Sequence, residues 1–194
     1  DVKSGLSITF TPESCQFGYR DSVFKNVLLD QFIITSVTFK LGKKPNLNIQ
    51  YPALQAALAG YSPQEITPEL VSQVVCDIRR SKLPDPKQTP NVGSFFKNPI
   101  ITPSKLVELQ QTYPDIVSYP VDETRVKLAA GWLIDRAGWK GRELEAAVHA
   151  EQALVLTNPK RLKGTAVLAL ASAIKEAILL KFGVELEQEP RNYP

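Results

Sequence analysis

Four prolines between residues 83 and 100, at positions 84, 86, 90 and 99, are the feature that most constrains how this chain can fold. Proline fixes its own φ and has no backbone N–H, so this stretch can be neither a long helix nor the interior of a sheet. The regular elements must therefore lie on either side of it. We predict a junction between domains at about residues 80–92.

Two predicted helices begin with a threonine followed by a proline, at Thr67-Pro68 and at Thr102-Pro103. The threonine side chain can accept a hydrogen bond from the first turn, and proline fits the first helical position. The first of these helices should end at Leu83. The residues expected to face inward are Val71, Val74, Val75 and Ile78 in the first helix, and Leu106, Leu109 and Tyr113 in the second.

Apolar residues at helical spacing predict two more helices. The longest covers about Thr165 to Phe182, and Gly183 stands just after its end, where glycine is favoured. The other covers Val126 to Ala137 and stops near Gly138.

Four segments are predicted as strands: Leu6–Phe10, Phe32–Leu41, Ala153–Leu156 and Val184–Glu189. Phe32–Leu41 carries the stronger alternation of the first two, and the residues on its apolar face are Ile33, Val37, Phe39 and Leu41. Residues 42–46 read as a turn, and residues 47–60 are ambiguous. Helices and strands mix without a strict strand–helix–strand rhythm, which favours an α+β fold.

The composition excludes several classes of protein. With 43% hydrophobic and 22% charged residues the chain is an ordinary globular one, and a net charge of +3 without a Lys/Arg run does not require nucleic acid. No apolar stretch is long enough to span a bilayer. A single histidine, His149, disfavours a zinc site, and neither of the common glycine-rich phosphate loops is present.

Cysteine and methionine usage carry two further expectations. Cys15 and Cys76 are too few for a disulfide framework and suit a reducing cytoplasm. The chain contains no methionine, so we expect it to be a fragment or a processed product whose missing part lies at least upstream.

The most informative polar residues lie in and around the proline-rich stretch. Lys82 and Asn98 could meet a diphosphate, and Ser94 places a hydroxyl next to a glycine. The alternative makes Gly93-Ser94 a turn and Phe95-Phe96 a hydrophobic plug, and the local sequence leaves both open.

Other polar clusters have ordinary explanations when each is taken alone. Residues 17–22 favour a capped turn with an Arg20–Asp21 surface pair of little energetic value. Lys127 suits a solvated helix start, and residues 187–191 suit an exposed tail. Residues 149–152 precede a buried strand, where polar groups either bind ligands or cap the strand.

Taken in order, however, these clusters resemble the UDP-N-acetylenolpyruvoylglucosamine reductase family. The most specific match is Gly-Ser-Phe-Phe-Lys-Asn-Pro at 93–99 following Lys-Leu-Pro-Asp-Pro at 82–86. The matching segments cover nearly the whole chain and are Phe17–Ser22, Ile34–Leu41, Lys82–Pro86, Gly93–Pro99, Lys127–Asp135, Val148–Asn158 and Leu186–Arg191.

The resemblance implies an enzyme that binds FAD, uses NADPH to reduce it, and reduces the enolpyruvyl group of a UDP-sugar to give UDP-N-acetylmuramate. It implies catalytic roles for three residues: Ser94 as the proton donor, Arg20 as the partner of the substrate carboxylate, and Glu189 acting from the opposite side. It implies substrate contacts by Lys82, Asn98 and Gln152 (diphosphate and sugar) and by Tyr51, Tyr119 and Lys127 (nucleotide), a flavin contact by Arg79, and no metal.

The resemblance also implies a domain division. Residues 1–88 would be the remnant of an FAD-binding region, 89–185 the substrate-binding domain, and 186–194 a strand that carries Glu189. The family's glycine-rich flavin loop would precede Asp1, so the main FAD site is expected outside this chain. Glycines usual in the family before Val148 are replaced by Glu145-Ala146.

We therefore expect a cytoplasmic monomer that binds a UDP-sugar and neither nucleic acid nor membrane, and whose isolated chain binds FAD weakly or not at all. The main alternative is a non-catalytic UDP-sugar-binding fragment that lacks its flavin domain. An interaction protein with a basic surface is a third class, and it predicts no pocket for a diphosphate.

Overall fold

The computed structural model describes residues 1–193 and divides into two compact units, Asp1–Asn46 (unit 1) and Leu47–Pro194 (unit 2), which we describe separately. This division lies upstream of the boundary predicted at residue 88. That boundary assigns segments to the domains of a longer protein, and it stays a prediction.

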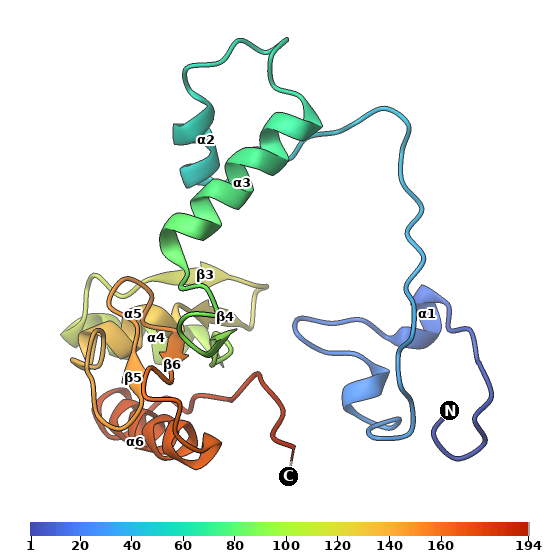
Figure 1. Cartoon of the computed structure of the whole chain (residues 1–194). Coiled ribbons are helices and arrows are strands. Elements are labelled where there is room, and N and C mark those ends of the chain that lie inside the picture. Colours follow the sequence, from blue (N-terminus) through green and yellow to red (C-terminus); the bar gives the residue numbers. More distant parts are fainter. Residues whose placement is uncertain (194) are drawn as a thin grey trace. The chain divides into compact units, whose positions relative to one another are not determined.

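Unit 1 contains two single-turn helices, α1 (Pro12–Cys15) and the 3₁₀ turn η1 (Val23–Lys25) (Figure 1). Thr11 caps α1 by accepting a hydrogen bond from the Ser14 amide. Three half-buried phenylalanines of unit 1, Phe10, Phe24 and Phe32, form a cluster whose ring centroids are 4.9–6.2 Å apart in edge-to-face geometry. A backbone hydrogen bond from Val2 N to Gln31 O (2.9 Å) joins residues far apart in this unit. Short-range turns, this cluster and that bond thus hold unit 1 together.

The two strands predicted in unit 1 are wrong for this chain, since neither Leu6–Phe10 nor Phe32–Leu41 forms a strand among the described residues. The backbone amides of residues 33–41 make no hydrogen bond within residues 1–193. A strand exists only where a neighbour completes its ladder of hydrogen bonds. The apolar alternation is therefore left in water, with Ile33 74%, Phe39 75% and Leu41 83% exposed.

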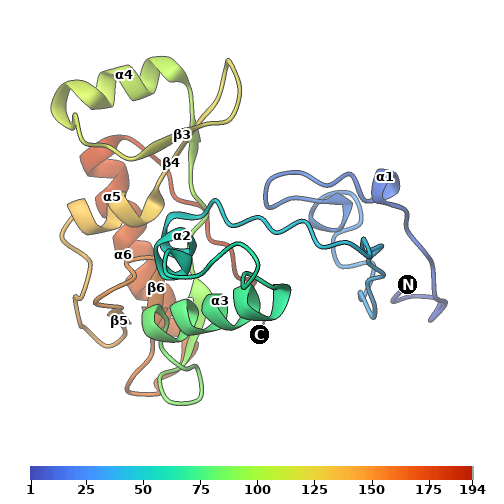
Figure 2. The same ribbon diagram turned by 90° about the horizontal axis from the view of Figure 1, so that it is seen from above.

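Unit 2 begins with a pair of helices, α2 (Pro52–Leu58) and α3 (Pro68–Lys82), which lie side by side (Figures 1 and 2). The ambiguous residues 47–60 thus contain a helix. As predicted, Thr67 caps α3 and the helix ends before Leu83. The apolar stripe of α3 was expected to be buried, but none of the described residues 68–82 is buried, and Val75 is 38% exposed. The stripe stays accessible because α3 contacts mainly the short α2.

The remaining elements form two small antiparallel sheets and three helices. The first sheet has the order β1 (Asn91–Ser94), β6 (Val155–Thr157), β5 (Ala147–Val148). The second has the order β2 (Ile100–Ile101), β4 (Val126–Leu128), β3 (Ser118–Pro120). The helices are α4 (Pro103–Thr112), α5 (Ala130–Arg136) and α6 (Gly164–Phe182), and the whole confirms the α+β class.

Most other predictions for unit 2 are confirmed. Thr102 caps α4, α6 ends at Gly183 with φ 62°, and the buried strand lies within two residues of its predicted position. In Figure 2, α5 and α6 lie side by side, and their buried faces enter one core. The fully buried side chains of that core include Phe96, Leu128, Leu133, Ile134, Leu156, Ile174, Ile178 and Leu186.

Two predictions for unit 2 need correction. The helix predicted over Val126–Ala137 is strand β4 followed by α5, because Val126 and Leu128 are buried on alternate positions between β2 and β3. The strand predicted over Val184–Glu189 is an extended segment with a single bridge, Phe96 to Gln188. The last residue of the predicted 186–194 strand, Pro194, lies outside the described residues.

Candidate functional site

Ser94 is the last residue of β1, and its position depends on an irregularity in that strand. Asn91 pairs with Thr157 and Ser94 pairs with Val155, so β1 holds one residue more than β6 between the two pairs. This is a β-bulge, and Gly93 within it has φ +74°, a conformation that favours glycine. Ser94 is exposed at the end of this bulge.

The proline-rich stretch is tied to β1 by Asn91. Its side-chain amide donates to the backbone oxygens of Pro84 (3.2 Å) and Thr89 (2.9 Å), and its Oδ1 accepts from Gly93 N (3.0 Å). One side chain thus fixes both the loop after α3 and the bulge before Ser94. The sequence alone does not distinguish this asparagine from its polar neighbours, because its partners are set by the folded loop.

Phe95 and Phe96 anchor the backbone immediately after Ser94. They are 3% and 1% exposed, and Phe95 N donates to Leu154 O (2.8 Å). The predicted hydrophobic plug is therefore present, but Gly93-Ser94 belongs to a strand rather than to a turn. A buried plug and an exposed hydroxyl occur together, so Ser94 stands on a rigid support.

Glu189 is held next to this support. Its backbone N donates to Phe95 O (2.9 Å), and Lys97 N donates to Glu187 O (2.9 Å). The C-terminal segment, Val184–Glu189, therefore runs antiparallel to the chain that follows Ser94. The structure brings Ser94 and Glu189 to neighbouring backbone positions, although 95 residues separate them in the sequence.

Asn98 faces the start of α5. Its Oδ1 accepts from Ala130 N (2.9 Å), the first helical residue, and the side chain is half-buried. Because the carboxamide oxygen is engaged, Nδ2 is the group that Asn98 can offer to a ligand. That group is a donor, which suits a phosphate or sugar oxygen.

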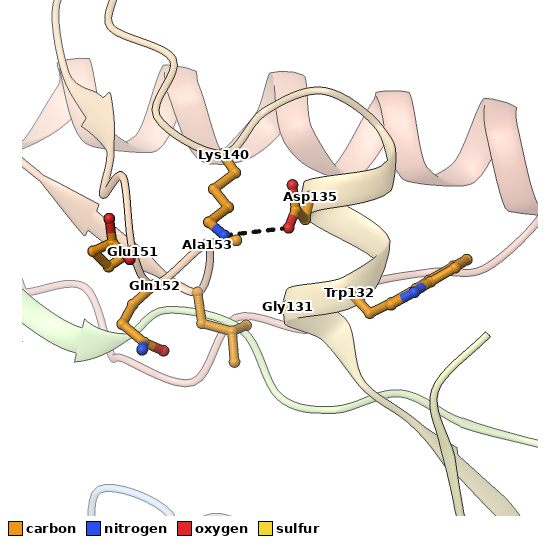
Figure 3. Close-up of a pocket in the computed structure, with 8 residues that line it drawn as sticks. Gly131, Trp132, Asp135, Lys140, Glu151, Gln152 and Ala153 are labelled. Carbon is orange, nitrogen blue, oxygen red and sulfur yellow. Dashed lines mark ion pairs between the residues drawn. The ribbon is translucent and has the colours of Figure 1, made fainter. Parts of the chain in front are cut away.

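Gln152 lies in the loop that precedes β6 and lines a small open pocket. The pocket residues are Gly131, Trp132, Asp135, Lys140, Glu151, Gln152, Ala153 and Leu154. An ion pair between Lys140 and Asp135 (3.4 Å) crosses it, and Figure 3 shows the Trp132 ring turned away from that pair. The backbone amides of Glu151 and Gln152 both donate to His149 Nδ1 (3.3 and 3.2 Å), so His149 caps this loop.

Tyr119 and Lys127 are brought together on the second sheet. They pair directly across β3 and β4, and Lys127 Nζ lies 5.7 Å from the centroid of the Tyr119 ring. Tyr119 is 48% exposed. An exposed ring beside a cation offers a stacking surface and a positive charge, which are the two features that a nucleotide needs.

The remaining candidates of unit 2 are exposed side chains around α2 and α3. Tyr51 immediately precedes α2 and is 65% exposed, while Arg79 and Lys82 lie in the last turn of α3. Lys82 is two residues from Pro84, whose carbonyl is bonded to Asn91, so it lies close along the chain to the support of β1.

Arg20 lies in unit 1, within a tight loop closed by a bridge between Gly18 and Asp21. Its backbone has φ 55°, which is uncommon for a residue other than glycine, and its carbonyl accepts from Lys25 Nζ (2.9 Å). Asp21 accepts from the Ser22 amide and from Asn26 Nδ2. Residues 17–22 are thus the predicted capped turn, with Arg20 in a strained conformation of the kind that clusters at functional sites.

Within the described part of the chain no group of His, Cys, Asp or Glu side chains could hold a metal ion. No helix among residues 1–193 has the length and apolarity needed to cross a membrane.

Comparison with known proteins defines the class to which this arrangement belongs. Residues 85–193 match the model of the family described as UDP-N-acetylenolpyruvoylglucosamine reductase, C-terminal domain. The match covers more than half of the chain, and the chain therefore belongs to this family.

Individual members of the family can also be compared with the chain. The chain is 48% identical over 193 residues to UDP-N-acetylenolpyruvoylglucosamine reductase of Paraburkholderia phytofirmans, a match that covers 98% of the chain and 56% of the relative. It is 50% identical to the reductase of the same name from Burkholderia multivorans (98% and 55%) and 46% identical to that from Pseudomonas savastanoi pv. phaseolicola (100% and 57%). The chain spans about half the length of the curated relatives it matches.

Proposed function

We propose that this chain is the C-terminal, substrate-binding part of an FAD-dependent reductase that uses NADPH to convert UDP-N-acetylglucosamine enolpyruvate to UDP-N-acetylmuramate. Such an enzyme would act in the cytoplasm, as a monomer, in peptidoglycan synthesis, and so in maintaining cell shape and division. The family match and the printed names of its relatives support the reductase activity. The observation that carries the proposal is the hydrogen bond that fixes Glu189 beside the support of Ser94.

The proposed chemistry divides between cofactor and protein. Reduced FAD supplies the hydride. Arrival of a hydride at one carbon of the enolpyruvyl double bond leaves negative charge on the neighbouring carbon and the carboxylate. Arg20 would pair with that carboxylate, Glu189 would act from the side opposite Arg20, and Ser94 Oγ would give its proton to the charged carbon.

The substrate contacts follow the geometry of unit 2. Asn98 Nδ2 would donate to a diphosphate or sugar oxygen because its Oδ1 already caps α5. Gln152 would add a second contact from the loop fixed by His149, and Lys82 a charge from the end of α3. Tyr119, Lys127 and Tyr51 would meet the nucleotide.

For FAD, the fitting group is Arg79. Its guanidinium is exposed in the basic last turn of α3, where it can donate to a phosphate. We propose that the main flavin site is supplied by other parts of the enzyme. Equilibrium dialysis of the isolated chain with FAD should therefore show weak binding or none, and tight stoichiometric binding would contradict this division.

The function is tested with Ser94→Ala in the full-length reductase, and Ser172→Ala on the exposed side of α6 serves as the control. We expect NADPH to reduce the flavin at the normal rate in both variants. Reduction of the enolpyruvyl substrate should collapse only in Ser94→Ala. If that variant turned over substrate at the normal rate, the proton-donor role would be wrong. If the unaltered protein bound the UDP-sugar but never reduced it, the chain would belong to a non-catalytic binding protein.

A further inference from the structure

Lys97 lies in the same stretch as Ser94 and Asn98 but has no part in the proposed chemistry. Its side chain is 20% exposed, and Nζ forms an ion pair with Oε1 of Glu187. The backbones of these two residues are also joined, since Lys97 N donates to Glu187 O (2.9 Å). A lysine between two candidate site residues is therefore directed toward the C-terminal segment.

The C-terminal segment needs such a contact because its apolar anchors stop before Glu189. Val184 and Leu186 are 3% and 2% exposed and belong to the core. After them, none of the described residues 187–193 is buried. The position of Glu189 thus depends on backbone hydrogen bonds and on side-chain contacts such as that of Lys97 with Glu187.

We propose that Lys97 is a positioning residue, which fixes the C-terminal segment through Glu187 and thereby holds Glu189 beside Ser94. The role in catalysis rests on the proposed function, whereas the positioning of the segment does not. The competing explanation is that Lys97 binds the substrate diphosphate directly, as Asn98 is proposed to do.

The two explanations differ in which kinetic constant changes and in what Glu187 contributes. A positioning residue affects the reacting geometry, so Lys97→Met should lower kcat by about tenfold and leave KM within about twofold. Glu187→Gln should reproduce this loss, because it removes the other half of the same pair. The double variant should be no worse than either single variant, and Lys97→Arg should restore most of the activity.

A second measurement, made on this chain alone, tests the positioning without relying on enzymatic activity. The Glu189 amide is hydrogen-bonded to Phe95 O, so its hydrogen exchange reports how firmly the segment is held. We expect Lys97→Met and Glu187→Gln to speed exchange at Glu189 about fivefold. Exchange at Val155 in β6 should not change. Lys160→Met is the matched control, since it removes an ion pair with Glu143 elsewhere on the surface.

Four outcomes of these measurements decide between the explanations. Faster exchange at Glu189 together with the loss in kcat supports the proposal. A rise in KM in Lys97→Met alone, with Glu187→Gln fully active, would overturn it in favour of a direct substrate contact. Unchanged exchange at Glu189 in both variants would also overturn it. If the unaltered full-length protein reduced no substrate while exchange still responded, the proposed function would fail and the positioning would stand.

Discussion

Two segments rich in apolar residues have opposite fates in this chain. Phe32–Leu41 in unit 1 and Ala153–Leu156 in unit 2 both predict a strand, and only the second contributes to one. Strand β6 lies between β1 and β5, so both of its edges are paired. Residues 33–41 have no pairing partner among residues 1–193. The comparison teaches that an apolar pattern marks a segment able to join a sheet, while the segment's partners decide whether a strand forms.

The largest expected difference between the two segments is in hydrogen exchange. Amides of β6 should be protected by about a thousandfold or more, because they open only with the core of unit 2. Amides of residues 33–41 should exchange within a few-fold of an unstructured peptide. Exchange measured by mass spectrometry on peptides from each segment checks this, and strong protection at residues 33–41 would remove the contrast.

Core substitutions give the next largest effect. Leu156→Ala should lower the free energy of unfolding by about 3 kcal/mol, because Leu156 is 1% exposed in a packed core. Phe39→Ala should change it by less than about 0.5 kcal/mol, because that ring is 75% exposed. Scanning calorimetry of the whole chain measures both variants, since Phe39 lies in unit 1, whereas both tryptophans, Trp132 and Trp139, lie in unit 2 and would report that unit alone. An equal cost at Phe39 would show that its segment is packed.

A smaller effect separates the structural role of Asn98 from its proposed role in ligand binding. Asn98→Ala leaves the Ala130 amide unpaired and should cost about 1–2 kcal/mol of stability. Asn98→Asp keeps an acceptor for that amide, so stability should be nearly unchanged, but it replaces the donor with a negative charge. Calorimetric titration with the UDP-sugar should therefore show lost binding in the folded Asp variant. Normal binding there would exclude the contact.

The smallest expected effect concerns local turns, one in each unit. In unit 2, hydrogen bonds from Arg125 and then Thr124 lower the pKa of Asp122 from 3.8 to about 2. In unit 1, a backbone hydrogen bond and then the Thr11 side chain lower the pKa of Glu13. Both carboxylates stabilise their turns only while ionised. The contribution of Asp122 is thus fully present above a pH of about 4 and is lost as the pH falls toward about 2.

Carboxyl titrations followed by NMR test this directly. The Thr124 amide, which donates to Asp122 Oδ1 (2.9 Å), should shift with the same midpoint as the Asp122 carboxyl, and Asp122→Asn should abolish that step. Because both turns are local, the carboxyl groups of Asp122 and Glu13 should each titrate below the ordinary pKa of their residue type, whichever unit they lie in. A normal midpoint at Glu13 would show that unit 1 lacks even its local order.

The parts of the fold that could be predicted are those specified by neighbouring residues. The Thr-Pro starts of α3 and α4 and the glycine after α6 depend on contacts within one helical turn. Strand β4 could not be predicted in this way. Val126–Leu128 is a strand because β2 and β3 flank it. The spacing of apolar residues along the chain predicted that the same residues begin a helix.

In the candidate site, too, features set by neighbouring residues could be predicted and features set by distant segments could not. The sequence singles out Ser94 and Asn98 in the proline-rich stretch and Glu189 through the resemblance, but their arrangement depends on the pairing of segments that are far apart in the chain. Lys97 was passed over because its partner, Glu187, is 90 residues away. No local pattern distinguishes a lysine that holds another segment from one that is solvated.

The bulge in β1 determines how the Ser94 hydroxyl is aimed, but not on which face of the sheet it lies. Thr157 and Val155 are two residues apart in β6, so their partners Asn91 and Ser94 lie on one face although they are three positions apart. Removing one residue between them would restore a regular ladder and keep that face, while the local bend and twist of the bulge would be lost. A one-residue deletion would thus misdirect the hydroxyl even though every strand pair remained.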